Sequence, residues 1–371
     1  MNKDTDERTP CKYGVECYQK NPEHLKKYKH PDKRNLSVTE NGDSPKKFKS
    51  EDDSSASVAE LPTDVKEIIK LLFLVDMPDD FYSFYEFCKS LSSSSPKKAL
   101  KSLNLELVGP FDVLDGGLKD CTKEEALRHY RYYFDPPEFQ TILKGDDKQQ
   151  LHYGYFRDDP EEFPCFVAKN YALVGPTITL VAGNIFGAVN VHAEEIKSTA
   201  DIFRKMQIQK LQANLVKWAK KNNISLDTVT PEIRSRRGKI VSKTLNKIGV
   251  VVPYDKKTDV GYRCLAVSED ELIKILKKIT SAENERERDA AWSELQQVIT
   301  AANIANDECD FGTSLELGLD MFAFGDELLH NSLERIMCTA YKLLNRNKFA
   351  EILHAHIKHR TKDASCLSTI V

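Results

Sequence analysis

The sequence near the N-terminus reads Cys11-Lys-Tyr-Gly-Val-Glu-Cys17-Tyr-Gln-Lys-Asn-Pro-Glu-His24-Leu-Lys-Lys-Tyr-Lys-His30-Pro31. Two thiolates and two imidazoles suit a tetrahedral Zn²⁺, and a segment this short cannot bury enough apolar surface to fold without a metal. The spacing therefore predicts a zinc finger whose ligands are Cys11, Cys17, His24 and His30. A DNA-reading finger has two to four residues between its cysteines and about twelve before its first histidine, so this finger differs from that class.

The finger resembles the poly(ADP-ribose)-binding (PBZ) type, which combines Cys-x-[Phe/Tyr]-Gly and Cys-Tyr with Asn-Pro-x-His and His-Pro. The resemblance implies that residues 1–31 bind poly(ADP-ribose), with Tyr13 and Tyr18 as stacking faces for adenine and Lys20 as a cationic contact. The family has Arg or Lys directly after the Cys-Tyr pair, whereas this chain has Gln19. The alternative interpretation is two cysteines and two histidines on an unstructured arm.

The composition is that of an ordinary globular chain. Of 371 residues, 40% are hydrophobic and 30% charged, which is enough for two modest domains or one large domain with an arm. The formal net charge of −3 excludes a polycation, so direct DNA binding is not expected and any polyanion contact must be local. No apolar run approaches the roughly 20 residues that span a bilayer, and no membrane association is expected. The odd number of cysteines, nine, indicates a reducing compartment.

The remaining chain divides by its hydrophobic patterns. Residues 32–57 are polar and are expected to form a disordered linker. Residues 58–193 predict an α+β domain that begins with helices at 64–73 and from about 79. Its short apolar runs, separated by turn residues, predict a largely antiparallel sheet. The expected strands occupy residues 105–108, 131–134, 152–156, 165–167, 178–181 and 188–191.

Residues 194–360 predict a mainly helical domain, and residues 361–371 a flexible tail. The expected helices occupy residues 195–220, 270–279, 284–305 and 326–356, with a short extended piece at 248–253. Strands grouped before helices indicate an α+β fold rather than a doubly wound sheet.

An acidic segment, Asn306-Asp-Glu-Cys-Asp310, follows the helix expected over 284–305. Acidic side chains at a helix C-terminus face the negative end of the helix dipole, so the segment is a candidate site. From the residues alone four interpretations stay open: a solvated helix end, Asp307 or Glu308 as a general base, a carboxylate metal site, or Cys309 as a nucleophile. The loop at 259–263 offers Tyr262 and Arg263, and spacing cannot show what Arg263 pairs with. The nucleotide-binding patterns G-x-G-x-x-G and G-x4-G-K-[ST] are absent from the sequence.

Beyond residue 60 the chain resembles the histone PARylation factor family. The matching stretches include Arg131-Tyr-Tyr-Phe-Asp-Pro-Pro-Glu-Phe-Gln-Thr141, Asp259-Val-Gly-Tyr-Arg263 and Asn306-Asp-Glu-Cys-Asp310. Further matches are residues 80–88, 107–111, 154–164, 251–253, 315–320 and 347–351.

The resemblance implies an accessory factor that docks onto the catalytic domain of a poly(ADP-ribose) polymerase and completes its active site. Glu308 would be the general base that directs ADP-ribose onto serine of histones, and Arg263 would orient it. Asp307 and Tyr262 would meet the polymerase, which holds NAD, so the chain alone is not expected to be an enzyme. The resemblance also implies a nuclear protein on chromosomes at sites of DNA damage, acting in DNA repair.

Two other functions stay open from the sequence. One is a binding adaptor without chemistry, in which the finger holds poly(ADP-ribose) and the helical domain docks a partner. The other is an independent ADP-ribose hydrolase that uses Asp307, Glu308 and Asp310.

Overall fold

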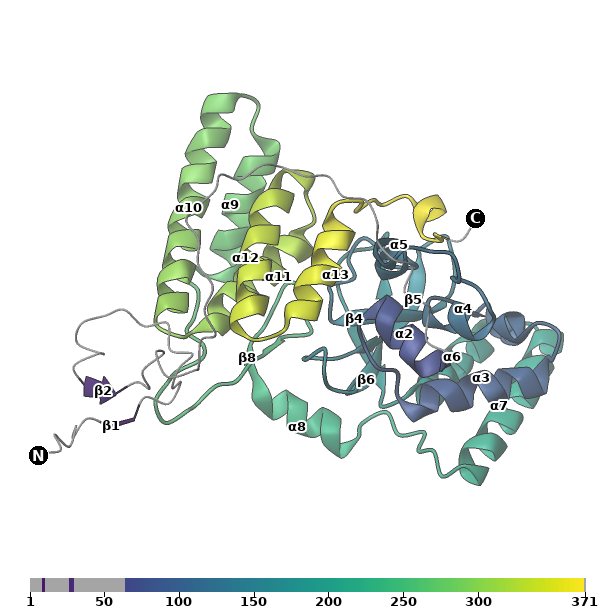
Figure 1. Cartoon of the computed structure of the whole chain (residues 1–371). Helices are drawn as coiled ribbons and strands as arrows, with labels where there is room; N and C mark the ends of the chain where they lie inside the picture. Colours follow the sequence, from purple (N-terminus) through teal and green to yellow (C-terminus); the bar gives the residue numbers. More distant parts are fainter. Residues whose placement is uncertain (1–8, 11–26, 30–63, 370–371) are drawn as a thin grey trace, which may run out of the picture. The chain divides into compact units, whose positions relative to one another are not determined.

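The computed structural model describes residues 9–10, 27–29 and 64–369 (Figure 1). Contacts within the chain divide it into two compact units, Met1–Ala59 and Glu60–Val371. In the first unit, β1 (Thr9–Pro10) pairs in parallel with β2 (Tyr28–Lys29). The four expected zinc ligands lie outside the described residues. So do the expected polymer contacts at Tyr13, Tyr18 and Lys20 and the linker at 32–57.

A five-stranded antiparallel sheet organises the second unit. Its spatial order follows the chain, so that each strand pairs with the next. The strands are β3 (Glu106–Leu107), β4 (Phe139–Lys144), β5 (Leu151–Phe156), β6 (Phe166–Tyr171) and β7 (Thr179–Ala182). The α+β class predicted from the sequence is therefore confirmed.

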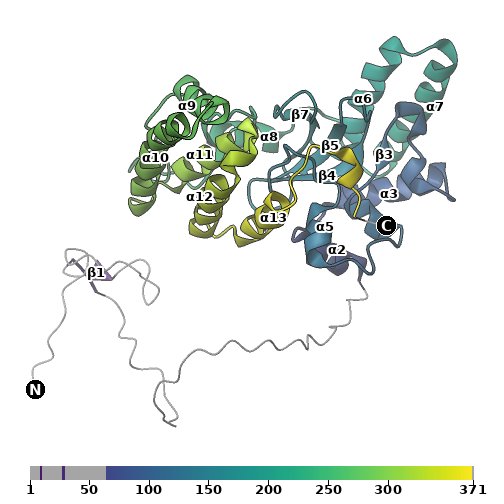
Figure 2. The same cartoon turned by 90° about the horizontal axis from the view of Figure 1, so that it is seen from above.

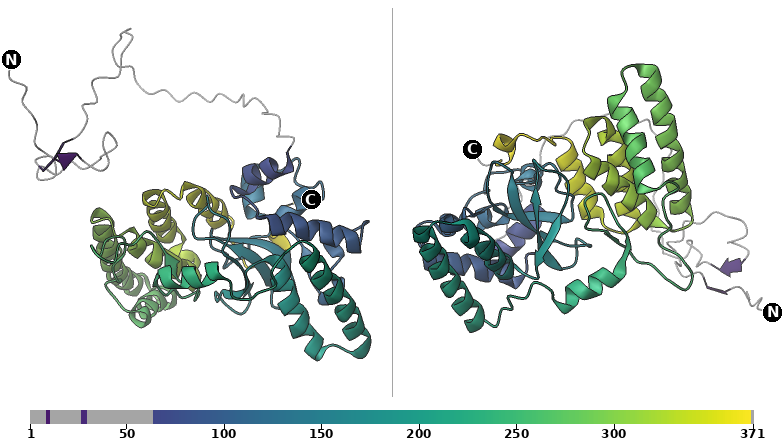
Figure 3. Two further views of the ribbon diagram at one scale, coloured as in Figure 1. Left: turned by 90° about the horizontal axis from the view of Figure 1, so that it is seen from below. Right: turned by 180° about the vertical axis from the view of Figure 1, so that it is seen from behind.

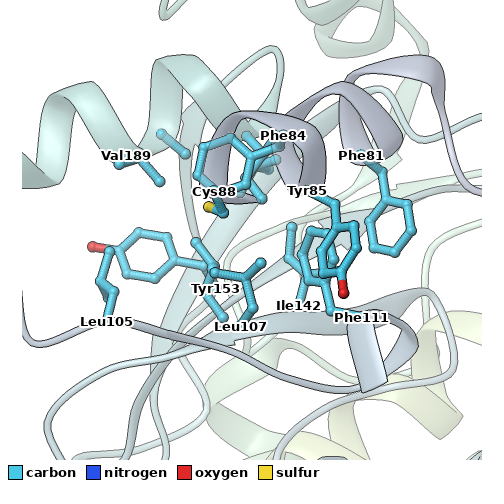
Figure 4. Packing of buried hydrophobic residues seen from close by; sticks show 14 of the residues in the cluster. Phe81, Phe84, Tyr85, Cys88, Leu105, Leu107, Phe111, Ile142, Tyr153 and Val189 are labelled. Carbon is cyan, nitrogen blue, oxygen red and sulfur yellow. The ribbon is translucent and has the colours of Figure 1, made fainter. Parts of the chain in front are cut away.

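Helices cover one face of this sheet and build the larger part of its core. They are α2 (Val65–Phe73), α3 (Asp79–Leu91), η3 (Pro96–Lys98), η4 (Lys101–Leu103), α4 (Pro110–Leu114), α5 (Lys123–Arg128), α6 (Ile185–Thr199) and α7 (Ile202–Lys221). Figure 4 shows aromatic residues of α3 above the sheet residues Ile142 and Tyr153. The Phe111 ring of α4 stacks on Phe81 of α3 with centroids 4.1 Å apart.

The opposite face of the sheet carries the alternate residues of the same strands. Tyr155 faces the first core, whereas its neighbour Phe156 packs with Phe166 in a second cluster. This alternation is the two-residue period of a strand buried on both faces. Ile233 of α8 (Pro231–Lys239) closes the second cluster.

A layer of helices lies beside the sheet and forms the rest of the unit (Figure 2). Its helices are α9 (Glu269–Ser281), α10 (Glu285–Asp307), α11 (Phe311–Phe324), η5 (Glu327–Leu329), α12 (His330–Leu343) and α13 (Asn347–Ile357). A short ribbon of β8 (Ile240–Ser242) and β9 (Val250–Val251) precedes them. Helix α11 contacts α9, α10 and α12, and nearly all its residues are buried.

Buried polar contacts join this helical layer to the segment directly before β4. The Tyr341 hydroxyl of α12 donates to Glu138 Oε1 at 2.8 Å. The Arg360 guanidinium donates to the carbonyls of Tyr133 and Phe322 and lies over the Phe322 ring, 3.8 Å from its centroid. These contacts explain why residues 60–371 form one unit, and the boundary expected at residue 194 falls within α6.

Two expected strands are wrong. Residues 131–134 form a turn, because the buried Arg131 side chain donates to the carbonyls of Leu127, Pro136 and Phe139 and folds the chain around itself. Residues 188–191 belong to α6 instead. The Asn184 side chain caps that helix by accepting from the Gly187 N–H at 2.9 Å.

The helix expected over 195–220 is interrupted. Helix α6 ends at Thr199, and Asp201 caps α7 by accepting from the Arg204 N–H. Strand β4 and helices α8 and α11 were not anticipated from the sequence.

The expected flexible tail includes the short helix η6 (Ala364–Cys366). The Tyr130 N–H donates to the Leu367 carbonyl at 2.7 Å, and Thr369 Oγ1 lies 3.1 Å from His129 Nδ1.

We expect Phe111→Ala to lower the free energy of unfolding by about 3–5 kcal/mol, because it removes a fully buried ring from a close-packed core. Phe163, whose side chain is 62% exposed, provides the control, and Phe163→Ala should change stability by less than about 0.5 kcal/mol. Denaturant unfolding measures both values. Equal effects of the two variants would contradict this description of the core.

Candidate functional site

The candidate site is built where the loop after β9 meets the junction of α10 and α11. Gly261 in this loop has a φ of +119°. A side chain there would place its Cβ 2.1 Å from the Pro253 carbonyl oxygen, so the position requires glycine. The Gly261 carbonyl accepts from the Gly312 N–H at 3.0 Å, which joins the loop to the first turn of α11.

The junction itself is a tight helix ending. The Asp310 N–H donates to the Ala305 carbonyl at 2.8 Å, and the Cys309 N–H donates to the Asn306 carbonyl at 3.0 Å. Cys309 takes the left-handed conformation with a φ of +72°. This pair of bonds with one left-handed residue is a Schellman motif. It turns the chain so that Glu308 and Asp310 both approach Arg263.

Asp310 holds the loop from inside the protein. Its side chain is only 5% exposed. Oδ1 accepts from the Gly261 N–H at 2.8 Å, and Oδ2 accepts from Arg263 Nε at 2.6 Å. The Thr313 hydroxyl adds two bonds to the Arg263 backbone, to its N–H at 3.1 Å and its carbonyl at 2.7 Å. The direction of the Arg263 side chain is therefore fixed by α11.

Glu308 lies at the surface and pairs with the outer edge of the Arg263 guanidinium. Arg263 Nη2 donates to Glu308 Oε2, and the two side chains are 44% and 56% exposed, respectively. The hydrogen bonds that Arg263 donates to Glu308 and Asp310 raise the pKa of its guanidinium above the ordinary value. Glu308 Oε1 forms no hydrogen bond with any residue that the structure describes. One carboxylate oxygen is thus held and the other is open to solvent.

The other two residues expected at this surface occupy different environments. Asp307 is the exposed last residue of α10 and makes no ion pair with the described part of the chain. Tyr262 is half-buried, and its hydroxyl donates to Glu316 Oε2 at 3.0 Å. The buried Glu316 also accepts from the Ser242 hydroxyl at 2.5 Å. Burial raises the pKa of Glu316, against the lowering effect of these two bonds.

Sequence reasoning missed the supporting residues Thr313 and Glu316 and the anchoring role of Asp310. The sequence does place an acidic residue at 310, but its bond to a residue 47 positions away depends on the packing of α11 against the loop.

The structure weakens two interpretations of the acidic segment. Within residues 64–369, His, Cys, Asp and Glu side chains form no group of three or more that could hold a metal. Cys309 serves as the left-handed residue of the helix ending, and its thiol forms no hydrogen bond with any residue that the structure describes, so no described base is placed to activate it. In the same described part, no helix is both long and apolar enough to cross a membrane.

Comparison with known proteins gives the family of this chain. The family described as Histone PARylation factor 1 matches residues 64–360, and the PBZ domain matches residues 8–33. The first match covers most of the chain, so this protein belongs to the Histone PARylation factor 1 family and carries an N-terminal PBZ domain. The match includes every residue of the candidate site.

Individual relatives agree with this assignment. The chain is 39% identical to Histone PARylation factor 1 of Danio rerio over 335 residues, which cover 89% of this chain and 95% of the relative. It is 39% identical to the Bos taurus protein of the same name, over 84% of this chain and 91% of the relative. A Homo sapiens protein, "Putative histone PARylation factor 1-like", is 35% identical, with 82% and 89% covered.

We expect Asp310→Ala to lower the free energy of unfolding by about 1–3 kcal/mol, because it leaves the buried Gly261 N–H without its acceptor. Asp307→Ala, which removes an exposed acid three residues away, should change stability by less than about 0.5 kcal/mol. Thermal or denaturant unfolding measures stability, and hydrogen exchange at the Gly261 amide should accelerate in Asp310→Ala alone. An unchanged exchange rate would contradict the anchoring role of Asp310.

Proposed function

We propose that this chain is an accessory factor that binds a poly(ADP-ribose) polymerase and completes its active site for modification of serine in histones. Membership of the Histone PARylation factor 1 family supports the partner and the type of modification. The observation that carries the catalytic part is Glu308, a surface carboxylate that Arg263 holds at one oxygen and leaves open at the other.

Glu308 would act as the general base. A serine hydroxyl is a poor nucleophile while it keeps its proton, and a carboxylate within about 3 Å can accept that proton as the bond to ADP-ribose forms. Such assistance is worth roughly 10²–10⁴ in rate. Glu308 Oε1 is the oxygen that can receive the proton, because Oε2 is engaged by Arg263.

Arg263 would position this base. Its guanidinium donates to Glu308 Oε2 and so restrains the direction of the carboxylate. Its own direction is set by Asp310 and Thr313, so Glu308 does not depend on a flexible contact for its orientation. Asp307 and Tyr262 lie next to these residues in the chain, and we assign them to the surface that meets the polymerase.

The reaction would be shared between two proteins. NAD bound by the polymerase supplies the ADP-ribose group and loses nicotinamide. The serine oxygen forms the new glycosidic bond, and its proton passes to Glu308. This chain thus contributes a base to a reaction whose cofactor it does not hold.

The PBZ domain would retain the factor where polymer accumulates. Its Cys11, Cys17, His24 and His30 form a Cys₂His₂ donor set that suits Zn²⁺. Tyr13, Tyr18 and Lys20 would contact poly(ADP-ribose). The same proposal puts the chain in the nucleus, on chromosomes at sites of DNA damage.

We expect Glu308→Gln to retain binding to the polymerase and to reduce serine labelling of histone at least 100-fold, because the amide cannot accept the proton. Arg263→Ala should reduce labelling less, since the base is still present but no longer held. The measurement is serine-specific labelling in a reconstituted reaction of polymerase, NAD, histone and each variant. Polymerase binding is measured separately by calorimetry.

Glu285→Gln, at the exposed start of the same helix, is the matched control and should label serine as the unmodified chain does. Full labelling with Glu308→Gln would instead favour an adaptor without chemistry. Release of ADP-ribose from modified histone by this chain alone would favour a hydrolase.

Loss of the metal should affect retention and spare the chemistry. We expect Cys17→Ala to lose zinc and binding to poly(ADP-ribose), because a three-ligand finger of this size cannot hold its fold. Serine labelling in the reconstituted reaction should stay within about twofold of the unmodified chain, since the base lies in the other unit. Zinc content, polymer binding and labelling are measured on the same preparation. Equal loss of labelling and polymer binding would show that the finger is not separable.

A further inference from the structure

A strong local excess of positive charge is found in residues 202–247. This segment contains twelve Lys and Arg residues and only two acidic residues, although the whole chain has a net charge of −3. It includes helices α7 and α8. Both lie along the lower edge of the unit in Figure 1 and again in the view from behind in Figure 3. We call the exposed side of these two helices the basic face.

The cations of this face are exposed and have no acidic partner among the residues that the structure describes. They are Lys210, Lys217 and Lys221 of α7 and Arg234, Arg237 and Lys239 of α8. None of the six forms an ion pair with any residue in the described part of the chain. Elsewhere in the unit surface lysines are commonly paired: Lys278 lies 2.7 Å from Glu294, and Lys348 lies 2.7 Å from Glu161. The basic face therefore presents charge that no acidic residue of the described part of the chain neutralises.

Packing fixes the direction of these side chains on α7. Ile208, Leu211 and Leu215 are buried in the main core. At 100° per residue, Lys210, Lys217 and Lys221 lie on the opposite side of the helix. With a rise of 1.5 Å per residue they are spaced by about 10 and 6 Å along a helix about 30 Å long. The result is a rigid row of cations.

The fixed spacing of the lysines in this row favours a rigid polyanion as the ligand. Double-stranded DNA carries one negative charge per about 1.7 Å of its axis. Single strands are bound by combining cations with aromatic stacking surfaces. Here Trp218 faces inward, where its Nε1 donates to the Ser83 hydroxyl at 3.1 Å. Phe203 is the one exposed aromatic residue of α7 and lies two turns before Lys210 on the same side of the helix. A single ring at one end of the row offers no series of stacking surfaces.

We infer that the basic face binds double-stranded DNA through its phosphate backbone, without sequence preference. This departs from the expectation based on net charge, which averages the basic face with the acidic remainder of the chain. Helix α8 continues directly into β8, and Ser242 of β8 bonds Glu316 beside Tyr262. DNA held on α8 would therefore lie near the residues that support the candidate site, because β8 connects α8 to Glu316. The inference does not depend on the proposed function, because DNA binding is measured without polymerase or NAD.

The test uses the full chain and a fluorescein-labelled 30-base-pair duplex, with binding followed by anisotropy across a series of salt concentrations. The face variant is Lys210→Gln with Lys217→Gln and Lys221→Gln. The matched control is Lys274→Gln with Lys277→Gln and Arg335→Gln, which removes the same charge from exposed positions on α9 and α12. Circular dichroism confirms that both variants are folded.

We expect the unmodified chain and the control to bind the duplex with micromolar affinity at low salt. The face variant should bind at least tenfold more weakly. The slope of log K against log salt should fall by about 2 to 3 in magnitude, because each phosphate contact contributes about 0.9. Two duplexes of unrelated sequence should bind equally.

Two outcomes would overturn the inference. The unmodified chain could fail to bind at low salt, or the face variant could bind as the control does. In the second case, loss of binding in Cys17→Ala would assign DNA binding to the N-terminal unit.

Discussion

The contact between Asp310 and the loop at 261–263 organises the candidate site. A single buried carboxylate accepts from the Gly261 N–H and from the Arg263 guanidinium. Its burial requires both partners, because an unpaired charge in the interior is strongly destabilising. The loop is consequently tied to α11, and the exposed Glu308 is presented on a rigid support rather than on a mobile segment.

This arrangement leaves the Glu308 side chain exposed while it restricts the orientation of that side chain. A general base that serves another protein's substrate must be reachable from outside, and exposed side chains ordinarily sample many rotamers. Here contacts with the buried Asp310 supply the free energy that restricts the rotamers of the exposed side chains. Asp310 orients Arg263, which in turn orients Glu308. The unfavourable position of acids at the end of α10 is offset locally by the guanidinium, so the helix dipole does not argue against the site.

The candidate site and the basic face are two regions of opposite charge on the surface of the same unit. Glu308 and Asp307 present negative charge at the end of α10, whereas α7 and α8 present six exposed cations that form no ion pair with the described part of the chain. A histone in chromatin offers a serine on the protein and phosphates on the DNA around it. Separate acidic and basic regions on one rigid unit would suit a substrate of that composition.

The sequence by itself determined the α+β class, most helices and the identity of the candidate residues, because those depend on local periodicity and on short motifs. It could not reveal α11, since a helix buried on all sides shows no amphipathic period. It also misassigned residues 131–134 and 188–191, where the buried Arg131 and the Asn184 cap override the strand propensity of Tyr, Phe and Val. Only the tertiary structure decided that Arg263 lies between Glu308 and Asp310, and that Lys210, Lys217 and Lys221 lie on the exposed face of α7. Both facts depend on packing between segments far apart in the chain, which no local pattern encodes.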